Sequence, residues 1–313
     1  MKLKILYHNV LNYTTTSKAK LEHNFDVVSI EKPGDDIPCD TSEIVAVFAP
    51  LGYKFDESYL AQFVNLRYIC TNTTGIPHID SVYCREKGLE IIGLHDQQDF
   101  LRTITPTAEH TLLLILALQR GLCRAQNGVL VGNEWNRRNY GGKRMLSRQT
   151  IGIIGYGRIG KIVGKVLGSL GSKIIYFDPY VAGSQKSIID IARNSDVISV
   201  HAVANSETKD LIDFDFFSHC KVDAIFVNTA RAEIVNQDAL LDALSSNKIA
   251  GAALDVLAGE YDQGFDPSTS ALVQLAKVND NLIITPHIGG STEDAWADTE
   301  GHVIDRLISM SCK

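Results

Sequence analysis

Short apolar runs rich in β-branched residues alternate with helical patterns along almost the whole chain. Strands that alternate with helices pair in parallel and are covered on both faces, so the pattern predicts an α/β protein with doubly wound parallel sheets. A first series of expected strands covers residues 4–7, 27–30, 44–48, 68–71 and 90–93. A second series covers residues 150–154, 173–177, 197–200, 224–228, 251–255 and 282–285.

A long helical pattern from Thr107 to Arg120 separates the two series. Thr107 is expected to cap this helix, and residues 112–118 are apolar nearly all round. Such a helix needs burial on several sides, so we expect it to form the contact of a homodimer. The apolar run is much shorter than the roughly 20 residues that cross a bilayer, and no membrane span is predicted. Shorter helices are expected at residues 57–63, 81–87 and 159–170 and from about 292.

Composition narrows the class of protein. The 313 residues suggest two domains, because a domain averages about 150 residues. With 45% hydrophobic and 21% charged residues, the chain is predicted to be globular, neither disordered nor collagen-like. The formal net charge of −7 argues against nucleic acid as a partner, since binding to a phosphate backbone needs a basic surface.

The N-terminal segment and the cysteines bear on the compartment. Residues 1–8 have a basic start but meet polar residues at once, which predicts a first strand and not a signal peptide. The six cysteines are scattered without a C-x-x-C pair, so we expect reduced thiols, with neither disulfides nor a metal site. These features predict a cytoplasmic protein.

A glycine-rich turn follows the expected strand at residues 150–154. Gly155, Gly157 and Gly160 form the pattern G-x-G-x-x-G at the start of a helix, where backbone N–H groups and the helix dipole bind a pyrophosphate. Asp178 ends the next strand, about 20 residues downstream, and a carboxylate there accepts the ribose hydroxyls of NAD and repels the 2′-phosphate of NADP. The glycine pattern also fits a turn that binds nothing, and Asp178 also fits a turn residue before Pro179.

Three polar residues follow strands of the second series. Arg231, Glu260 and His287 come after the strands expected at 224–228, 251–255 and 282–285. Ligands of open α/β sheets bind beside such strand ends, so the three side chains are candidates for catalysis. Taken singly, each one also fits a solvated surface charge or a turn residue.

With these elements the sequence resembles the D-isomer-specific 2-hydroxyacid dehydrogenases, the group that includes 3-phosphoglycerate, glycerate, formate and D-lactate dehydrogenases. The resemblance covers nearly the whole chain. It implies two doubly wound parallel-sheet (Rossmann-like) domains of the formate/glycerate dehydrogenase type, with the active site in the cleft between them. Residues 1–98 plus 292–313 would form a discontinuous substrate domain, and residues 99–291 would form the NAD-binding domain. The motifs that carry it are residues 75–80, 108–110, 155–160, 196–201, 207–208, 228–231, 255–260 and 285–291.

The resemblance assigns catalytic roles to the three polar residues. Arg231 would grip the carboxylate and carbonyl oxygen of a small 2-oxo acid, because its fork of donors fits both. His287 would protonate the carbonyl oxygen as hydride arrives from the nicotinamide, and would act in reverse on the D-2-hydroxy acid. Glu260 would orient the imidazole and favour its protonated form. A substrate like 3-phosphoglycerate is one of the expected possibilities.

The resemblance also implies further contacts with cofactor and substrate. Thr74 and Gly75 would bind the substrate through backbone amides, with Thr74 also near the cofactor, although a polar turn explains them equally well. His201 would lie near the adenosine, or would be a satisfied strand-end residue. The other implied cofactor contacts are Arg158, Ile159, Thr208, Thr229, Ala230, Arg231, Asp255, His287, Gly289 and Gly290.

Several positions depart from the family pattern, and they leave the substrate open. Ala232 stands where the family usually has glycine, and a left-handed backbone there would be strained. Asn236 replaces a frequent aspartate, Tyr261 and Pro77 replace a usual proline and aspartate, and residues 202–205 lack a proline. An NAD-binding sensor or corepressor-like protein with little turnover is the alternative function, and a nucleotide-binding protein without catalysis is another. No regulatory domain is expected after His287.

Overall fold

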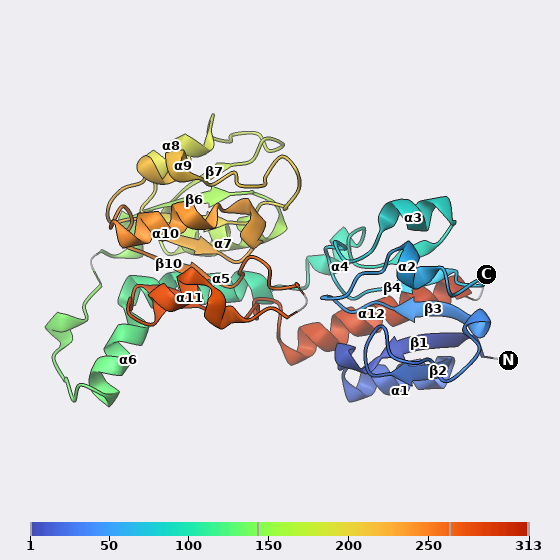
Figure 1. Cartoon of the computed structure of the whole chain (residues 1–313). Helices are drawn as coiled ribbons and strands as arrows, with labels where there is room; N and C mark the ends of the chain where they lie inside the picture. Colours follow the sequence, from blue (N-terminus) through green and yellow to red (C-terminus); the bar gives the residue numbers. More distant parts are fainter. Residues whose placement is uncertain (1, 143, 263, 312–313) are drawn as a thin grey trace. The chain divides into compact units, whose positions relative to one another are not determined.

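The computed structural model describes residues 2–142, 144–262 and 264–311, and the chain folds into two compact units (Figure 1). The first unit takes the described residues of 1–104, 261–264 and 291–313, and the second takes 105–260 and 265–290. Both expected segments of the substrate domain, 1–98 and 292–313, fall in the first unit. Residues 99–104, 261–264 and 291, which we assigned to the NAD-binding domain, fall there as well.

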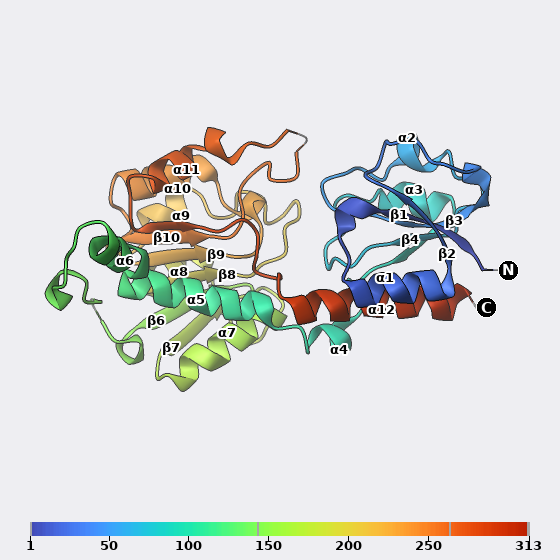
Figure 2. The same cartoon turned by 90° about the horizontal axis from the view of Figure 1, so that it is seen from below.

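The first unit is a parallel sheet of five strands in the order β2-β1-β3-β4-β5. Helices α1 and α12 cover one face and α2 and α3 the other (Figure 2). Neighbouring residues of a strand point to opposite faces, so Ile5 packs under α1 and α12 while Leu6 packs on the other side. The elements are β1 (Lys4–His8), α1 (Thr15–Asn24), β2 (Asp26–Ile30), β3 (Ile44–Phe48), α2 (Glu57–Leu60), β4 (Tyr68–Cys70), α3 (Ser81–Glu86), β5 (Glu90–Ile92), α4 (Gln98–Leu101) and α12 (Glu293–Ser311).

The second unit is a parallel sheet of six strands in the order β11-β10-β9-β8-β6-β7. Helices α5 and α7 cover one face, and α8 to α11 cover the other (Figure 2). The chain reverses direction across the sheet between β6 and β8, and the crevice outside such a switch point is where ligands bind. The elements are α5 (Pro106–Arg120), α6 (Leu122–Leu130), β6 (Thr150–Ile154), α7 (Arg158–Ser169), β7 (Lys173–Phe177), α8 (Ile188–Asn194), β8 (Val197–Val200), α9 (Phe214–Ser218), β9 (Ile225–Asn228), α10 (Gln237–Ser245), β10 (Gly251–Leu254), α11 (Ala271–Ala276) and β11 (Leu282–Ile284).

The expected strands are confirmed, each within one residue at either end. The prediction that Thr107 caps the long helix is wrong: Thr105 takes the N-cap position, and α5 begins at Pro106, whose fixed φ suits a first helical position. The helix expected at 57–63 ends at Leu60, because Phe63 N donates to Leu60 O and tightens the chain into a turn. Within the described residues no helix has the length and apolarity to span a membrane.

Candidate active site

The glycine turn lies between β6 and α7 at the switch point of the second sheet. Gly155 has φ +89°, and a Cβ atom on it would lie 2.4 Å from Ala202 N, so only glycine lets the turn approach the segment after β8. A Cβ on Gly160 would lie 2.3 Å from Gly155 O, which ties helix α7 closely to the turn. Gly157 differs, since a Cβ built on it meets no atom within 4 Å. Gly157 therefore borders open space beside the first N–H groups of α7, which is where an anion would bind.

Charged side chains flank this turn on two sides. Arg158 lies half-buried in the first turn of α7, and its burial lowers the pKa of the guanidinium. The positive end of the helix dipole and the guanidinium both favour an anionic ligand at this helix N-terminus. Asp178 follows β7, and its carboxylate accepts hydrogen bonds from Tyr156 N (2.8 Å) and Tyr180 N (3.0 Å). The carboxylate of Asp178, which is expected to bind the ribose hydroxyls, is therefore held beside the glycine turn.

The segment after β8 carries His201 and Thr208. His201 N donates to Ile154 O at the end of β6, and the imidazole is hydrogen-bonded to the Ser199 hydroxyl at 2.8 Å. Burial lowers the pKa of His201 to about 3, so the ring is neutral at physiological pH and does not attract phosphate by charge. The Thr208 hydroxyl donates to Val203 O at 2.6 Å and so stabilises the turn between these two residues. His201 directly follows β8, at the edge of the sheet where the cofactor was expected.

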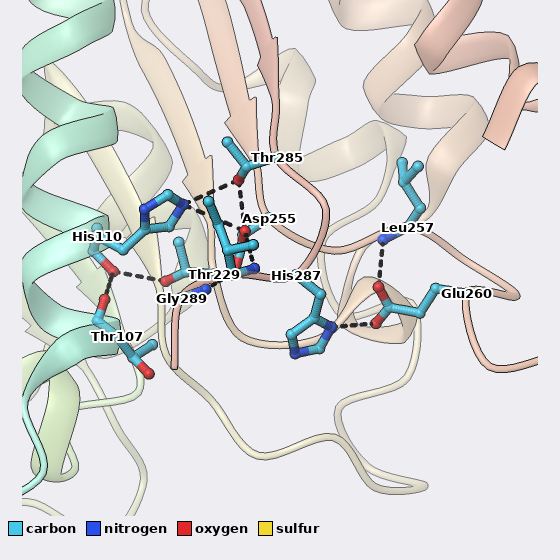
Figure 3. A network of polar contacts seen from close by, with 11 residues as sticks. Thr107, His110, Thr229, Asp255, Leu257, Glu260, Thr285, His287 and Gly289 are labelled. Carbon is cyan, nitrogen blue, oxygen red and sulfur yellow. Dashed lines mark hydrogen bonds and ion pairs between the residues drawn. The ribbon is translucent and has the colours of Figure 1, made fainter. Parts of the chain in front are cut away.

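His287 and Glu260 form a hydrogen-bonded pair at the same edge of the second sheet. The loops after β11 and β10 bring Glu260 Oε1 to 2.8 Å from His287 Nδ1 (Figure 3). Glu260 is mostly buried and His287 is about one-third exposed, so the pair is partly shielded from water. Glu260 Oε2 also accepts from Leu257 N at 3.5 Å, which fixes the carboxylate. A histidine so paired has the arrangement of an acid–base catalyst whose ring orientation is set by a carboxylate.

Asp255 anchors the loop that carries His287. Its side chain is 1% exposed and receives hydrogen bonds from Thr285 Oγ1 (2.5 Å), Ile288 N (2.9 Å) and Gly289 N (2.7 Å). His110 Nε2, on α5, approaches the same carboxylate at 3.3 Å and Thr285 Oγ1 at 3.0 Å (Figure 3). The loop from Thr285 to Gly289 is therefore held by a buried acid that directly follows the neighbouring strand β10.

Arg231 follows β9 in extended backbone (φ −148°). Its Nη1 donates to Ala230 O at 2.7 Å, and Asn228 braces the turn by accepting from Ala230 N and donating to Arg231 O. Thr229, just before, shares a hydrogen bond of 2.7 Å with Thr111 of α5. The three catalytic candidates thus follow β9, β10 and β11, which are neighbours in one sheet.

Comparison with known proteins gives the family. A family model described as "D-isomer specific 2-hydroxyacid dehydrogenase, NAD binding domain" matches residues 112–289, more than half of the chain. The chain belongs to the D-isomer-specific 2-hydroxyacid dehydrogenases. Residues 112–289 correspond to the NAD-binding domain of that family, which confirms the resemblance found in the motifs.

Individual relatives in this dehydrogenase family show the extent of the likeness. D-3-phosphoglycerate dehydrogenase of Mycobacterium leprae is 32% identical over 249 residues, covering 77% of this chain and 44% of the relative. Glycerate dehydrogenase of Methylorubrum extorquens is 29% identical, covering 79% and 77%. The structure of D-lactate dehydrogenase from Aquifex aeolicus, complexed with NAD and lactic acid, superposes with a TM-score of 0.84 at 26% identity, covering 98% and 95%. The chain spans about half the length of the phosphoglycerate dehydrogenases it matches.

Two departures from the family pattern are accommodated by the structure. The strain expected at Ala232 is absent, because Ala232 begins a right-handed 3-10 turn (Ala232–Ile234) that alanine adopts readily. Asn236 caps α10 by accepting from Ala239 N at 3.0 Å, as an aspartate would. These substitutions leave the turn after Arg231 and the following helix intact.

The expected substrate loop lies in the first unit, after β4. Thr73 Oγ1 donates to Gly75 O at 2.6 Å, so the loop that holds Thr74 and Gly75 is fixed from within. Thr71 Oγ1 contacts Thr73 Oγ1 at 3.0 Å and His78 Nε2 at 3.3 Å. Burial lowers the pKa of His78 to about 4, which keeps its ring neutral.

Some contacts that hold the catalytic loop were not expected from the sequence: Asp255 and Thr229 were expected to contact the cofactor, and no role was expected for His110 or Thr111. His110 lies in the family motif at residues 108–110, but its distance along the chain from Thr285 and Asp255 does not indicate that they are in contact. Thr111 and Thr229 were missed as a pair for the same reason. Among the described residues, no three His, Cys, Asp or Glu side chains are grouped to hold a metal ion.

Proposed function

We propose that this protein is an NAD-dependent oxidoreductase that transfers a hydride between NAD(H) and a small D-2-hydroxy acid or its 2-oxo acid. The observation that carries the proposal is the 2.8 Å pair of Glu260 and His287. This pair lies in loops that follow β10 and β11, at the carboxyl edge of the same sheet whose β6 leads into the glycine turn. Membership of the dehydrogenase family and the relatives named above support it.

His287 would move the proton in this reaction. Glu260 takes up Nδ1, so Nε2 is the ring nitrogen that would give a proton to the carbonyl oxygen or accept one from the hydroxyl. The carboxylate of Glu260 stabilises the protonated ring and sets its orientation. Arg231 would bind the substrate carboxylate with its planar fork. In the first unit we keep Thr74 and Gly75 as the substrate-binding residues that the resemblance implies.

The residues of the glycine turn fit a bound dinucleotide. Gly157 leaves room for a pyrophosphate, and Arg158 with the N-terminus of α7 supplies positive charge. The carboxylate of Asp178 would accept ribose hydroxyls and repel a 2′-phosphate, which favours NAD over NADP. His201, Thr208 and the residues 229–231 would lie along the nucleotide, and Gly289 and Gly290 near the nicotinamide. When bound, NAD would supply or accept the hydride.

Charge in the first unit bears on the substrate. The loops after β2, β3, β4 and β5, at residues 31–36, 49–56, 71–80 and 93–97, lie at the carboxyl edge of the sheet. They carry two lysines against six carboxylates, of which Asp96 is paired with Arg306. Such a field repels a phosphate dianion, so we propose a substrate without a phosphate group. The residues are Lys32, Lys54, Glu31, Asp35, Asp36, Asp56, Asp80 and Asp96.

A panel of 2-oxo acids tests both proposals. NADH oxidation would be followed with glyoxylate, hydroxypyruvate, pyruvate and 3-phosphohydroxypyruvate, with NADPH in parallel. We expect turnover with an unphosphorylated acid, and kcat/KM for 3-phosphohydroxypyruvate at least about tenfold below that for hydroxypyruvate. Preference for the phosphorylated acid would contradict the charge argument alone. NADH binding without turnover on any acid would favour the sensor or corepressor-like alternative.

An exposed apolar surface favours a homodimer. Although α5 buries Leu114 and Ile115, Leu113 and Leu116 on its other side are exposed. Helix α6 extends from the end of α5 (Figure 1), and Leu130, Val131 and Trp135, at and after its end, are 69%, 80% and 90% exposed. An apolar surface of this extent on a monomer marks an interaction site. We therefore keep the predicted homodimer, with α6 added to the Thr107 to Arg120 region.

The mass in solution tests this contact. We expect light scattering to give twice the mass of one chain, and the double variant Val131→Asp, Trp135→Ser to give the mass of one chain. Val278→Asp serves as the control, because Val278 is 84% exposed outside this surface. A monomeric wild-type protein, or a dimer that survives the double variant, would exclude this surface as the interface.

The cysteines support the predicted compartment. Five of them are free thiols in the structure, namely Cys39, Cys70, Cys84, Cys123 and Cys220. Burial raises the pKa of Cys84 to about 11 and that of Cys220 to about 12, so these thiols stay protonated and unreactive. Free thiols are typical of a reducing compartment, and a cytoplasmic location remains our prediction.

A further inference from the structure

The backbone of the catalytic histidine needs an external restraint. His287 has φ +53°, in the left-handed region that residues with a Cβ atom adopt at a cost. The two following N–H groups, of Ile288 and Gly289, both donate to the carboxylate of Asp255. Asp255 therefore holds the backbone that directly follows His287.

The hydrogen bonds around Thr285 determine which ring nitrogen of His110 carries a hydrogen. A carboxylate only accepts, so the Thr285 hydroxyl donates its proton to Asp255 Oδ1 at 2.5 Å. The Thr285 oxygen then has lone pairs alone to offer, and His110 Nε2 at 3.0 Å must be the donor. The same Nε2 lies 3.3 Å from Asp255 Oδ1. His110 thus carries hydrogen on Nε2 and shares it between the hydroxyl and the carboxylate (Figure 3).

His110 connects the catalytic loop to a different layer of the unit. It comes from α5, whereas Asp255 follows β10 and Thr285 follows β11. Its side chain is 10% exposed, so its hydrogen bond forms where water competes poorly. The adjacent Thr111 makes a second tie from α5, to Thr229 in the turn before Arg231. One turn of α5 therefore reaches the loops of both His287 and Arg231.

We infer that His110 is a positioning residue for the catalytic histidine. The donor at its Nε2 orients Thr285 and Asp255, and Asp255 in turn holds the backbone after His287 so that the ring meets Glu260. The inference rests on the proposed function for its consequence in turnover. The geometric part, that His110 sets the environment of the His287 ring, does not depend on turnover.

Two variants of His110 separate donation from packing. Glutamine places an N–H donor at about the position of Nε2, whereas leucine fills similar space without a donor. We expect His110→Leu to lower kcat by about tenfold or more, since a displaced catalytic group can cost about a hundredfold, with the dissociation constant of NADH changed less than twofold. His110→Gln should stay within about threefold of wild type. Thr285→Val should resemble His110→Leu, and the double variant should add little because both act through Asp255.

A readout independent of turnover completes the test. The Cε1–H resonance of His287, assigned with His287→Asn, should move in His110→Leu and stay near its wild-type position in His110→Gln. Equal kcat and unmoved resonances in both variants, with a lowered melting temperature in His110→Leu, would overturn the inference by showing a packing role only. If the wild type itself lacks turnover, the proposed function fails, and the resonance still decides whether His110 positions His287.

Discussion

His287→Ala is expected to lower kcat by about a thousandfold, because a positioned general acid–base contributes roughly 10² to 10⁴ in rate. The dissociation constant of NADH should stay close to the wild-type value, since the turn at Gly155 to Gly160 follows β6, whereas the loop of His287 follows β11. Steady-state NADH oxidation and fluorescence titration of NADH measure the two quantities. Near-normal turnover in this variant would show that Glu260 and His287 are not the acid–base pair.

Two further variants control for backbone and charge effects in this experiment. His287→Asn keeps a residue that tolerates φ +53°, so a similar loss of kcat would place the effect on the ring. His219→Ala removes an imidazole from the same unit that is hydrogen-bonded to Asp215 O, far along the chain from the catalytic loop. This control should leave kcat unchanged.

Gly157→Ala is expected to weaken NADH binding by about tenfold or more, equivalent to at least about 1.4 kcal/mol, while leaving the fold intact. The Cβ would meet no protein atom within 4 Å, and φ is −78°, so alanine fits the backbone. The methyl group would instead occupy the space where backbone must approach the pyrophosphate. NADH titration and thermal unfolding measure the two effects.

Gly155→Ala is the matched contrast. Its Cβ would lie 2.4 Å from Ala202 N at φ +89°, and a left-handed residue with a Cβ costs about 1–2 kcal/mol before any clash. We expect the melting temperature to fall by about 5 °C or more together with NADH binding. Unchanged NADH binding in Gly157→Ala would mean that the cofactor does not bind at this turn.

Local patterns predicted what depends on local physics. The strand Thr150–Ile154 was predicted without error, because a run buried on both faces and followed by glycine has few other interpretations. The pairing of Glu260 with His287 came from the resemblance, and the structure supplies the distance. Contacts across layers were not predictable, as His110 and Asp255 belong to elements whose packing no spacing in the chain reveals.

Exposure was the other feature that the pattern missed. The run at residues 112–118 suggested a helix buried nearly all round, yet Leu113 and Leu116 face outward. The apolar pattern of a helix does not show which side chains pack in the core of the same chain and which contact another molecule. The position of α5 on the second sheet decides this, and that position depends on packing with α7.

The packing of α12 affects how the first unit folds during synthesis on the ribosome. Val303, Ile304 and Leu307 of this helix complete the core that begins with Ile5 and Leu21. Synthesis runs from the N-terminus, so every strand of the second unit emerges before these three side chains do. The side chains of β1 and α1 therefore keep part of their apolar surface uncovered until α12 has been made. During that interval this exposed apolar surface is prone to aggregation, and a chaperone that covers it would protect the unfinished unit.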